Sequence, residues 1–256
     1  MKQGLDRYQF VFIGGLHKSG TSLLFKCLRN HEQVSGFHDT GVSQDEGQHL
    51  QNVYPPARIY GGPGKFGFRP EAHLTETSNL VTEDAAQALF DQWSGYWDLN
   101  MPVLLEKSPP NLLKTRYLQA LFPNAYFIIL LRHPIAVSLA TQRWSRTPIY
   151  RLFDHWLACH QLFDGDRSNL KNLFIVKYED FVAYPEQALR CVYQFLGLDY
   201  ASPGMEIRSD VNGEYIRRWK KNGIYTTALS CAYEKRVNCF GYSLRQPKTV
   251  HPYPFA

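Results

Sequence analysis

The chain has 256 residues, of which 44% are hydrophobic, and this composition suits an ordinary globular protein of one large domain or, less readily, two small ones. Its net charge of +5 is weak and dispersed, which argues against a nucleic-acid partner and suits a small polyanionic ligand. The first residues hold no long apolar stretch, and the longest apolar run, 127–131, is too short to span a membrane. We therefore expect neither a signal peptide nor a membrane span, and we predict a cytoplasmic protein.

The cysteines show no sign of a metal site or of a disulfide framework. The five of them form no Cys-x-x-Cys pair and no zinc-like spacing with histidine, so we predict free thiols in the core. Cys231 and Cys239 could pair only in an oxidising compartment.

The first predicted element is an apolar strand that leads through a glycine-rich turn into a helix. Residues 8–22 read Tyr-Gln-Phe-Val-Phe-Ile-Gly-Gly-Leu-His-Lys-Ser-Gly-Thr-Ser, and we predict the strand at 9–13 and the helix at 19–30. Such a turn directs backbone N–H groups and a helix N-terminus at one spot, where they can bind a phosphate group. The segment therefore predicts a phosphate site.

The remaining elements alternate short apolar strands with helices. In chain order we predict a strand at 34–37, a loop at 39–78, a helix at 84–97, a strand at 102–105, a helix at 111–122, a strand at 125–131, helices at 134–142 and 150–163, a strand at 173–177 and a helix at 185–196. This order favours an α/β fold, a three-layer sandwich with a central parallel β-sheet, in a single domain over 1–256. The long loop is expected to shape the active site, because loops of this length are usually functional or mobile. Together with the helices at 143–165, it is expected to shape the substrate pocket.

Polar clusters follow four of the predicted strands. They are the loop 14–22 and the segments that begin Glu106-Lys-Ser-Pro, Arg132-His-Pro and Tyr178-Glu-Asp. Ligands of parallel sheets bind at the carboxyl ends of the strands. We therefore expect these clusters to meet in one site.

The lysine of the glycine-rich turn does not stand where an ATP site requires it. Gly15, four further residues and Gly20 match a Walker A loop, but that loop has a lysine directly after its second glycine. Thr21 occupies that position here, and Lys18 lies before Gly20. This register argues against ATP and Mg²⁺ chemistry and for another phosphate compound.

Several segments resemble motifs of the sulfotransferase family, whose members use 3′-phosphoadenosine 5′-phosphosulfate (PAPS). The resemblance covers about residues 8–245 and implies the P-loop NTPase-like sulfotransferase fold. In chain order the segments are His17-Lys-Ser-Gly-Thr-Ser-Leu-Leu, Glu106-Lys-Ser-Pro-Pro, Leu131-Arg-His-Pro-Ile-Ala-Val-Ser, Val176-Lys-Tyr-Glu-Asp-Phe and Ile216-Arg-Arg-Trp-Lys-Lys-Asn-Gly.

The resemblance implies roles for the cations. Lys18 would contact the bridging oxygen and the leaving phosphate, and Lys107 would stabilise charge on the sulfuryl oxygens. Arg132 would bind the 3′-phosphate through charge-assisted hydrogen bonds. The residues expected to hold the 5′-phosphosulfate are His17, Lys18, Ser19, Gly20, Thr21 and Ser22.

The later segments match with departures. The family's serine for the 3′-phosphate falls at Ala140, and of the flanking hydroxyls Ser138 is our candidate. Tyr178 is expected to contact adenosine, with packing in the core as the alternative. Arg218 and Lys220 are expected to fold over the 3′-phosphate, with a solvated basic stretch as the alternative.

A general base would assist sulfuryl transfer to a hydroxyl. The resemblance implies a glutamate or histidine between the phosphate loop and the Glu-Lys-Ser-Pro segment. The candidates are His38, Asp39, Asp45, Glu46 and His49. We favour Glu46, with His38 second, and expect His49 to be structural or to face the substrate.

The sequence thus predicts a PAPS-dependent sulfotransferase that transfers the sulfuryl group to an acceptor hydroxyl and releases adenosine 3′,5′-bisphosphate, with no metal. A P-loop nucleotide kinase and an inactive nucleotide-binding module are the alternatives. A glycan, a small molecule such as a phenol, or a peptidyl tyrosine could be the acceptor. The expected lack of a membrane anchor favours a bacterial-type enzyme acting on a small molecule or a glycan.

Overall fold

A parallel β-sheet forms the centre of the protein, for which a computed structural model describes residues 5–221 and 223–251. The strands are β1 (Gln9–Gly15), β2 (Val34–Gly36), β3 (Val103–Lys107), β4 (Tyr126–Leu131) and β5 (Asn172–Lys177), in the spatial order β2-β3-β1-β4-β5. Every neighbouring pair is parallel. Strands β1, β3 and β4 are almost completely buried, as expected for a parallel sheet covered on both faces.

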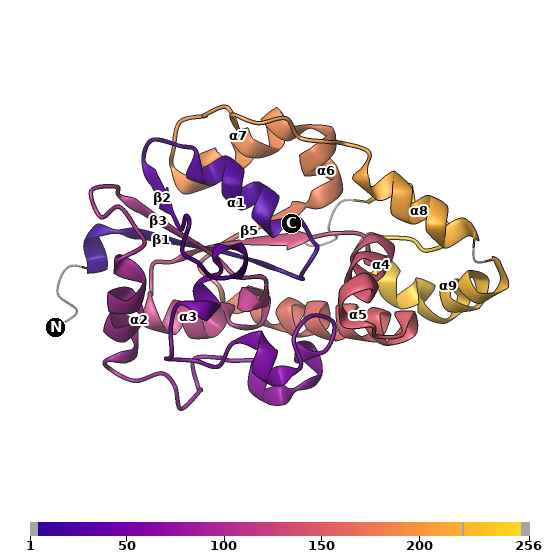
Figure 1. The fold of residues 1–256 in the computed structure, drawn as a ribbon, viewed down its shortest axis with the longest axis horizontal. Coiled ribbons are helices and arrows are strands. Elements are labelled where there is room, and N and C mark those ends of the chain that lie inside the picture. The colour runs from indigo at the N-terminus through magenta and orange to yellow at the C-terminus, as the bar shows by residue number, and fades with distance from the viewer. Residues whose placement is uncertain (1–4, 222, 252–256) are drawn as a thin grey trace.

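Helices cover both faces of the sheet (Figure 1). Helices α1, α6 and α7 lie on one face and α2, α3 and α5 on the other, while α4, α8 and α9 gather beyond the carboxyl ends of the strands. Their bounds are α1 Thr21–Arg29, α2 Ala85–Ser94, α3 Thr115–Leu121, α4 Pro134–Ser145, α5 Ile149–Asp166, α6 Tyr178–Ala183, α7 Pro185–Leu196, α8 Val211–Lys221 and α9 Gly223–Asn238. The predicted three-layer α/β fold is confirmed.

The carboxyl end of β1 lies at the point where the connections diverge. The chain leaves β1 through α1 to reach the edge strand β2, and later crosses on the opposite face from β3 to β4. Ile13 pairs with Lys107 of β3, and Gly15 pairs with Leu130 of β4, so these three strands end level with one another. Such a switch point opens a crevice in which doubly wound proteins bind their ligands.

The predicted strands and helices agree with the observed ones to within a few residues, with one exception. The helix expected at 111–122 begins as a 3₁₀ turn, Pro109–Leu113, and becomes α-helical only at Thr115. Pro109 and Pro110 have no N–H group to donate, and the Asn111 side chain is engaged with β1 and β3 instead. Helices α6, α8 and α9 were not predicted.

The long loop at 39–78 is built from single 3₁₀ turns and is firmly attached to the core. Tyr54 and Phe66 are buried, and His73 contacts Asp166 of α5 at 2.6 Å. At the end of the loop, Glu76 pairs with Arg116 of α3. The loop is therefore a fixed wall beside the sheet.

The structure tests the predictions of buried thiols and of no membrane-spanning helix. Cys27 and Cys159 are buried, as predicted, whereas Cys191, Cys231 and Cys239 are exposed, so the expectation of core thiols is wrong for these three. Cys231 and Cys239 are both free thiols. Within residues 5–221 and 223–251, the helices are too short or too polar to cross a bilayer.

Candidate active site

The phosphate loop at the end of β1 adopts a backbone that only glycine can supply at two positions. A Cβ at Gly15 would lie 2.7 Å from the Leu130 carbonyl oxygen, and a Cβ at Gly20 would lie 2.5 Å from the Tyr178 ring. Both glycines have positive φ, 155° and 102°. Gly20 is the N-cap of α1, and no side chain in the described part of the chain caps this helix. The first N–H groups of α1 are therefore available to an anion.

Lys18 lies in the same loop with a left-handed backbone, φ 71°, which is unusual for a residue with a side chain. Its carbonyl oxygen accepts a hydrogen bond from Arg132 Nη1 at 2.8 Å. The end of β4 thus fixes the conformation of the loop at the end of β1.

A pocket of about 310 Å³ opens in front of this loop. Its walls come from the phosphate loop, the start of α1, the segment around residue 44 and the ends of the strands. The predicted site residues that line it are His17, Lys18, Gly20, Thr21, Ser22, Glu46, Arg132 and Tyr178. The expectation that the polar clusters meet at one edge of the sheet is therefore confirmed for the phosphate loop, Arg132 and Tyr178.

Arg132 directly follows β4, and all but one of its guanidinium nitrogens donate hydrogen bonds. Its guanidinium lies 3.9 Å from the centroid of the Tyr178 ring, and its Nε donates to Asn212 Oδ1 at 2.9 Å. Its Nη2 is buried and has no hydrogen-bond partner among the described residues. A buried donor of this kind is costly unless a ligand or water satisfies it.

Glu179 organises the surroundings of Arg132, although no role was predicted for it. Its Oε1 accepts from the His133 backbone N at 3.0 Å and from Asn212 Nδ2 at 2.6 Å. Its Oε2 accepts from the Tyr242 hydroxyl at 3.0 Å. Glu179 thereby ties α6, the start of α4, the start of α8 and the C-terminal segment together. It is the first of the two acidic residues in the Tyr-Glu-Asp motif, and this motif was the signal that could have indicated its role. No local signal indicated Asn212.

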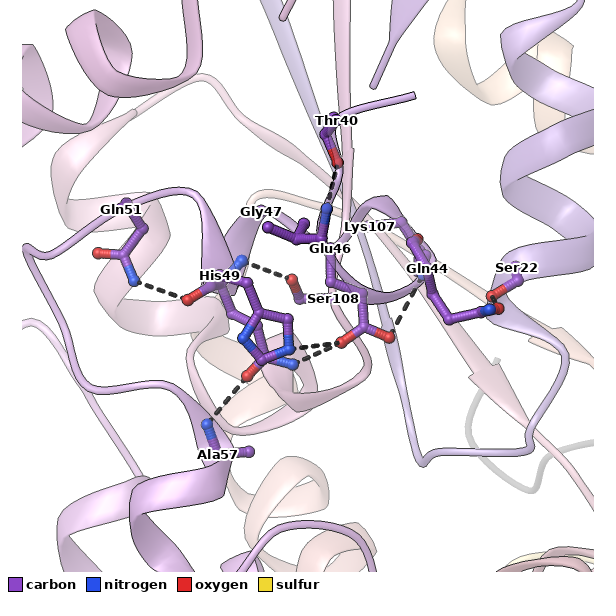
Figure 2. Close-up of polar contacts among 12 residues, drawn as sticks. Ser22, Thr40, Gln44, Glu46, Gly47, His49, Gln51, Ala57, Lys107 and Ser108 are labelled. Carbon is purple, nitrogen blue, oxygen red and sulfur yellow. Dashed lines mark hydrogen bonds and ion pairs between the residues drawn. The ribbon is translucent and has the colours of Figure 1, made fainter. Parts of the chain in front are cut away.

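Lys107 and Glu46 contact each other beside the pocket (Figure 2). Glu46 lines the pocket, whereas the completely buried Lys107 side chain is not among the lining residues. Lys107 Nζ lies 3.4 Å from Glu46 Oε1 and donates to the Gln44 carbonyl oxygen at 2.9 Å. Glu46 Oε2 accepts from Gln48 Nε2 at 2.5 Å, and His49 Nε2 lies 3.8 Å away. Burial lowers the pKa of Lys107, and the neighbouring Glu46 and Glu106 carboxylates oppose this shift.

Glu106 places Glu46 by holding the next residue along the loop. Its fully buried carboxylate accepts from the Gly47 backbone N at 2.9 Å, from Ser108 Oγ at 2.6 Å and from Asn111 Nδ2 at 2.5 Å. A Cβ at Gly47 would lie 2.6 Å from Glu106 Oε1, so only glycine fits. Burial raises the pKa of Glu106 to about 7.

His38, Ser138 and Lys220 lie away from the pocket lining. The His38 side chain is 60% exposed and pairs with Asp39 at 2.7 Å, so the geometry favours Glu46 over His38 as the base. Buried Ser138 lines a separate cavity of about 10 Å³ together with His17. Exposed Lys220 lines a groove between α8 and α9.

The other predicted residues are placed as follows. Ser19 is buried, and its Oγ lacks a partner among the described residues. Arg218 Nη1 on α8 is likewise buried and unpaired within the described part of the chain. Burial lowers the pKa of His17 to about 3, so this side chain is neutral. Trp144, near the end of α4, lines the pocket; it lies in the segment 143–165 that was expected to shape the substrate pocket, but it was not named as a site residue.

Comparisons with known proteins bear on the family and the fold of the chain. Residues 10–202 match a family model described as the sulfotransferase family. Protein-tyrosine sulfotransferase A of Caenorhabditis elegans is 24% identical over 203 residues, which cover 75% of this chain and 50% of the relative. Protein-tyrosine sulfotransferase 2 of Gallus gallus is 25% identical over 204 residues, which cover 75% and 52%. The chain thus spans about half the length of these relatives.

Among solved structures, sulfotransferase STF1 from Mycobacterium tuberculosis superposes with a TM-score of 0.53 at 14% identity. The match covers 79% of this chain and 71% of that chain. At this identity the likeness concerns the fold alone.

Proposed function

The chain belongs to the sulfotransferase family, and we propose that it transfers the sulfuryl group of PAPS to an acceptor hydroxyl and releases adenosine 3′,5′-bisphosphate. The observation that carries this proposal is a single pocket lined both by groups suited to phosphate and by a carboxylate. The phosphate loop, Arg132 and Glu46 line it, and buried Lys107 pairs with Glu46. Groups that can bind the donor nucleotide and a group that can accept the proton of an acceptor hydroxyl therefore face the same space.

The residues present fit the donor nucleotide. A volume of about 310 Å³ is within the range of small-molecule sites. Arg132, which lines the pocket, has a buried donor, Nη2, without a protein partner among the described residues, and such a donor suits a phosphate group. Ser19 Oγ and Arg218 Nη1 are likewise buried and unpaired within the described part of the chain, although neither residue lines the pocket. When bound, PAPS supplies an activated sulfuryl group on a phosphate leaving group.

Groups at the phosphate loop and at the end of β4 would bind and orient the donor nucleotide. The N–H groups at the start of α1 and the Lys18 ammonium would hold the 5′-phosphosulfate. Arg132 would bind the 3′-phosphate through Nη2, since its other nitrogens are engaged with Lys18 and Asn212. Tyr178, stacked on Arg132 and packed on Gly20, would lie beside the adenosine. Ser138, Arg218 and Lys220 stay predictions for the 3′-phosphate.

For the acceptor, Glu46 Oε1 would take the proton of the hydroxyl group. Lys107, 3.4 Å away, would stabilise negative charge on the sulfuryl oxygens without having to reorganise. Because Glu106 and Trp93 hold Gly47, the Glu46 carboxylate is fixed before the acceptor arrives. His49 faces Glu46 and is the second residue on that side.

The acceptor can be chosen by experiment among a peptidyl tyrosine, a phenol and a glycan. The names of the relatives make a tyrosine peptide the first to test. Purified protein is incubated with sulfur-labelled PAPS and each acceptor, and labelled product is counted. Wild-type transfer that falls at least a hundredfold in both Lys107→Met and Glu46→Gln would support the proposal. Equal transfer by all three proteins would contradict it.

Three further expectations belong to the proposal. The lysines and Arg132 supply the positive charge, so we expect no metal requirement. A cytoplasmic location and the lack of a nucleic-acid partner stay predictions from the sequence. An inactive nucleotide-binding module would bind adenosine 3′,5′-bisphosphate but transfer label to none of the acceptors.

A further inference from the structure

The Lys18 ammonium lies on the face of an indole ring at the mouth of the pocket. Lys18 Nζ is 3.9 Å from the centroid of the Trp144 ring, a close cation–π distance. Trp144 belongs to α4, lines the pocket and is 55% exposed. The contact therefore joins two elements far apart in the sequence at the edge of the proposed active site.

The backbone of Lys18 is fixed, but its side chain is exposed. Arg132 holds the Lys18 carbonyl oxygen, and the left-handed φ of 71° sets the direction in which the side chain leaves the loop. An exposed lysine with a four-carbon stem samples many rotamers, most of which direct its ammonium into solvent. Some contact must select the rotamer that keeps the ammonium in the pocket.

Trp144 is itself held in place. The His17 ring packs edge-on at 6.4 Å from the Trp144 ring, and His17 packs in turn on buried Phe66 at 5.7 Å. His17 is neutral, because burial lowers its pKa to about 3, and it therefore does not repel the neighbouring ammonium. Packing against His17 therefore restricts the orientation of the Trp144 ring, although the side chain is exposed.

We infer that Trp144 is a positioning residue, whose ring holds the Lys18 ammonium inside the pocket where an anionic phosphate of the donor binds. The inference rests on the proposed function for the identity of that phosphate, while the contact itself exists in the free protein. Trp144 acts through Lys18 and need not touch the acceptor. Its removal therefore weakens nucleotide binding only as long as Lys18 is present.

The contact is tested first without any ligand. In a proton–nitrogen correlation spectrum, the Trp144 indole signal is assigned by its loss in Trp144→Phe. Lys18→Met is expected to shift this signal, whereas Lys26→Met, which removes an exposed lysine of α1, leaves it in place. An unchanged indole signal in Lys18→Met would overturn the inference.

The function of the contact is tested by a double-mutant cycle with adenosine 3′,5′-bisphosphate as the calorimetric probe. Trp144→Leu is expected to weaken binding about 2- to 30-fold, and Trp144→Phe less, because a phenyl ring still offers a π face. In a Lys18→Met background, Trp144→Leu should have no further effect. Tyr150→Leu, a similarly exposed aromatic at the start of α5, is the matched control and should bind as wild type.

Two outcomes of the double-mutant cycle would overturn this inference and leave the proposed function intact. They are wild-type affinity in Trp144→Leu, and a loss in Trp144→Leu that persists in full without Lys18. If wild-type protein does not bind the probe, the proposed function fails and the inference fails with it. The melting temperature of each variant shows that an observed loss is not a loss of fold.

Discussion

The Lys107 ammonium lies 3.4 Å from the Glu46 carboxylate, although the two residues stand 61 positions apart and the Lys107 side chain is completely buried. An ion pair in this position is weak evidence for stability, because desolvation of both charges offsets their attraction. Its location beside a phosphate loop makes a catalytic role the better explanation.

Replacement of Glu46 tests the base. Glu46→Gln keeps the size of the side chain but cannot accept a proton, so kcat should fall about 10²- to 10⁴-fold. The affinity for adenosine 3′,5′-bisphosphate should change little, since Glu46 is proposed to act on the acceptor rather than to bind the nucleotide. Initial rates and calorimetry measure the two effects. Asp45→Asn, which alters the neighbouring carboxylate that binds Thr40, is the control; an equal loss in both variants would contradict the assignment.

Replacement of Gly47 tests how Glu46 is placed. The added methyl group of Gly47→Ala would meet Glu106 Oε1 at 2.6 Å, so the loop must shift. We expect a loss of about 1–3 kcal/mol in the free energy of unfolding, as for overpacked sites, together with a large fall in kcat. Urea unfolding measures the first effect. Gly95→Ala, where an added Cβ meets nothing within 4 Å, should unfold within about 1 kcal/mol of wild type.

The buried Glu106 predicts a dependence of stability on pH. Burial raises the pKa of Glu106 from 4.5 to about 7, so between these values the folded protein binds more protons than the unfolded chain. The free energy of unfolding contributed by this group therefore falls as the pH rises from about 4.5 to 7, by up to ~3 kcal/mol. Glu106→Gln removes this contribution. The difference in the free energy of unfolding between wild type and Glu106→Gln, measured across this pH range, separates the contribution of Glu106 from that of the buried histidines. A difference that does not vary with pH would refute the prediction.

Asn212 tests the support of Arg132. Asn212→Ala removes the acceptor of Arg132 Nε and a partner of Glu179, so the guanidinium loses its fixed direction. We expect adenosine 3′,5′-bisphosphate to bind about 3- to 10-fold more weakly, which corresponds to about 1 kcal/mol, the net worth of one typical hydrogen bond. Glu214 lies on α8, as Asn212 does, and forms an exposed ion pair with Arg143 of α4. Glu214→Gln should leave the affinity unchanged. Equal affinities in all three proteins would show that Arg132 needs no such support.

The phosphate loop and the sheet could be predicted because their signals are local. A strand, two obligatory glycines and a helix start follow one another within residues 8–22, and Lys18 stands in a register that a Walker A loop excludes. The location of Arg132 and Tyr178 could be predicted because each directly follows a strand and the carboxyl ends of parallel strands share one edge. The roles expected of them came from the resemblance to the sulfotransferase family.

The remaining parts of the site depend on contacts distant in sequence. Glu46 could be favoured but not placed, because its position depends on Glu106 holding Gly47 across the loop. Trp144 lies in the segment 143–165 that was expected to shape the substrate pocket, but it could not be named, because its contact with Lys18 joins residues far apart in the sequence. Asn212 follows a stretch without regular periodicity, and nothing local indicates that it contacts Arg132. His38 had the right chemistry, but its side chain turns outward to Asp39.

The most direct test of the account is a calorimetric comparison of adenosine 3′,5′-bisphosphate with ATP in the presence of Mg²⁺. The account predicts micromolar binding of the bisphosphate, which Arg132→Ala abolishes and Arg143→Ala, the change of an exposed arginine on α4, leaves intact. Weak or absent binding of ATP with Mg²⁺ should accompany it. Preferential binding of ATP with Mg²⁺, or bisphosphate binding that is indifferent to Arg132, would contradict the account.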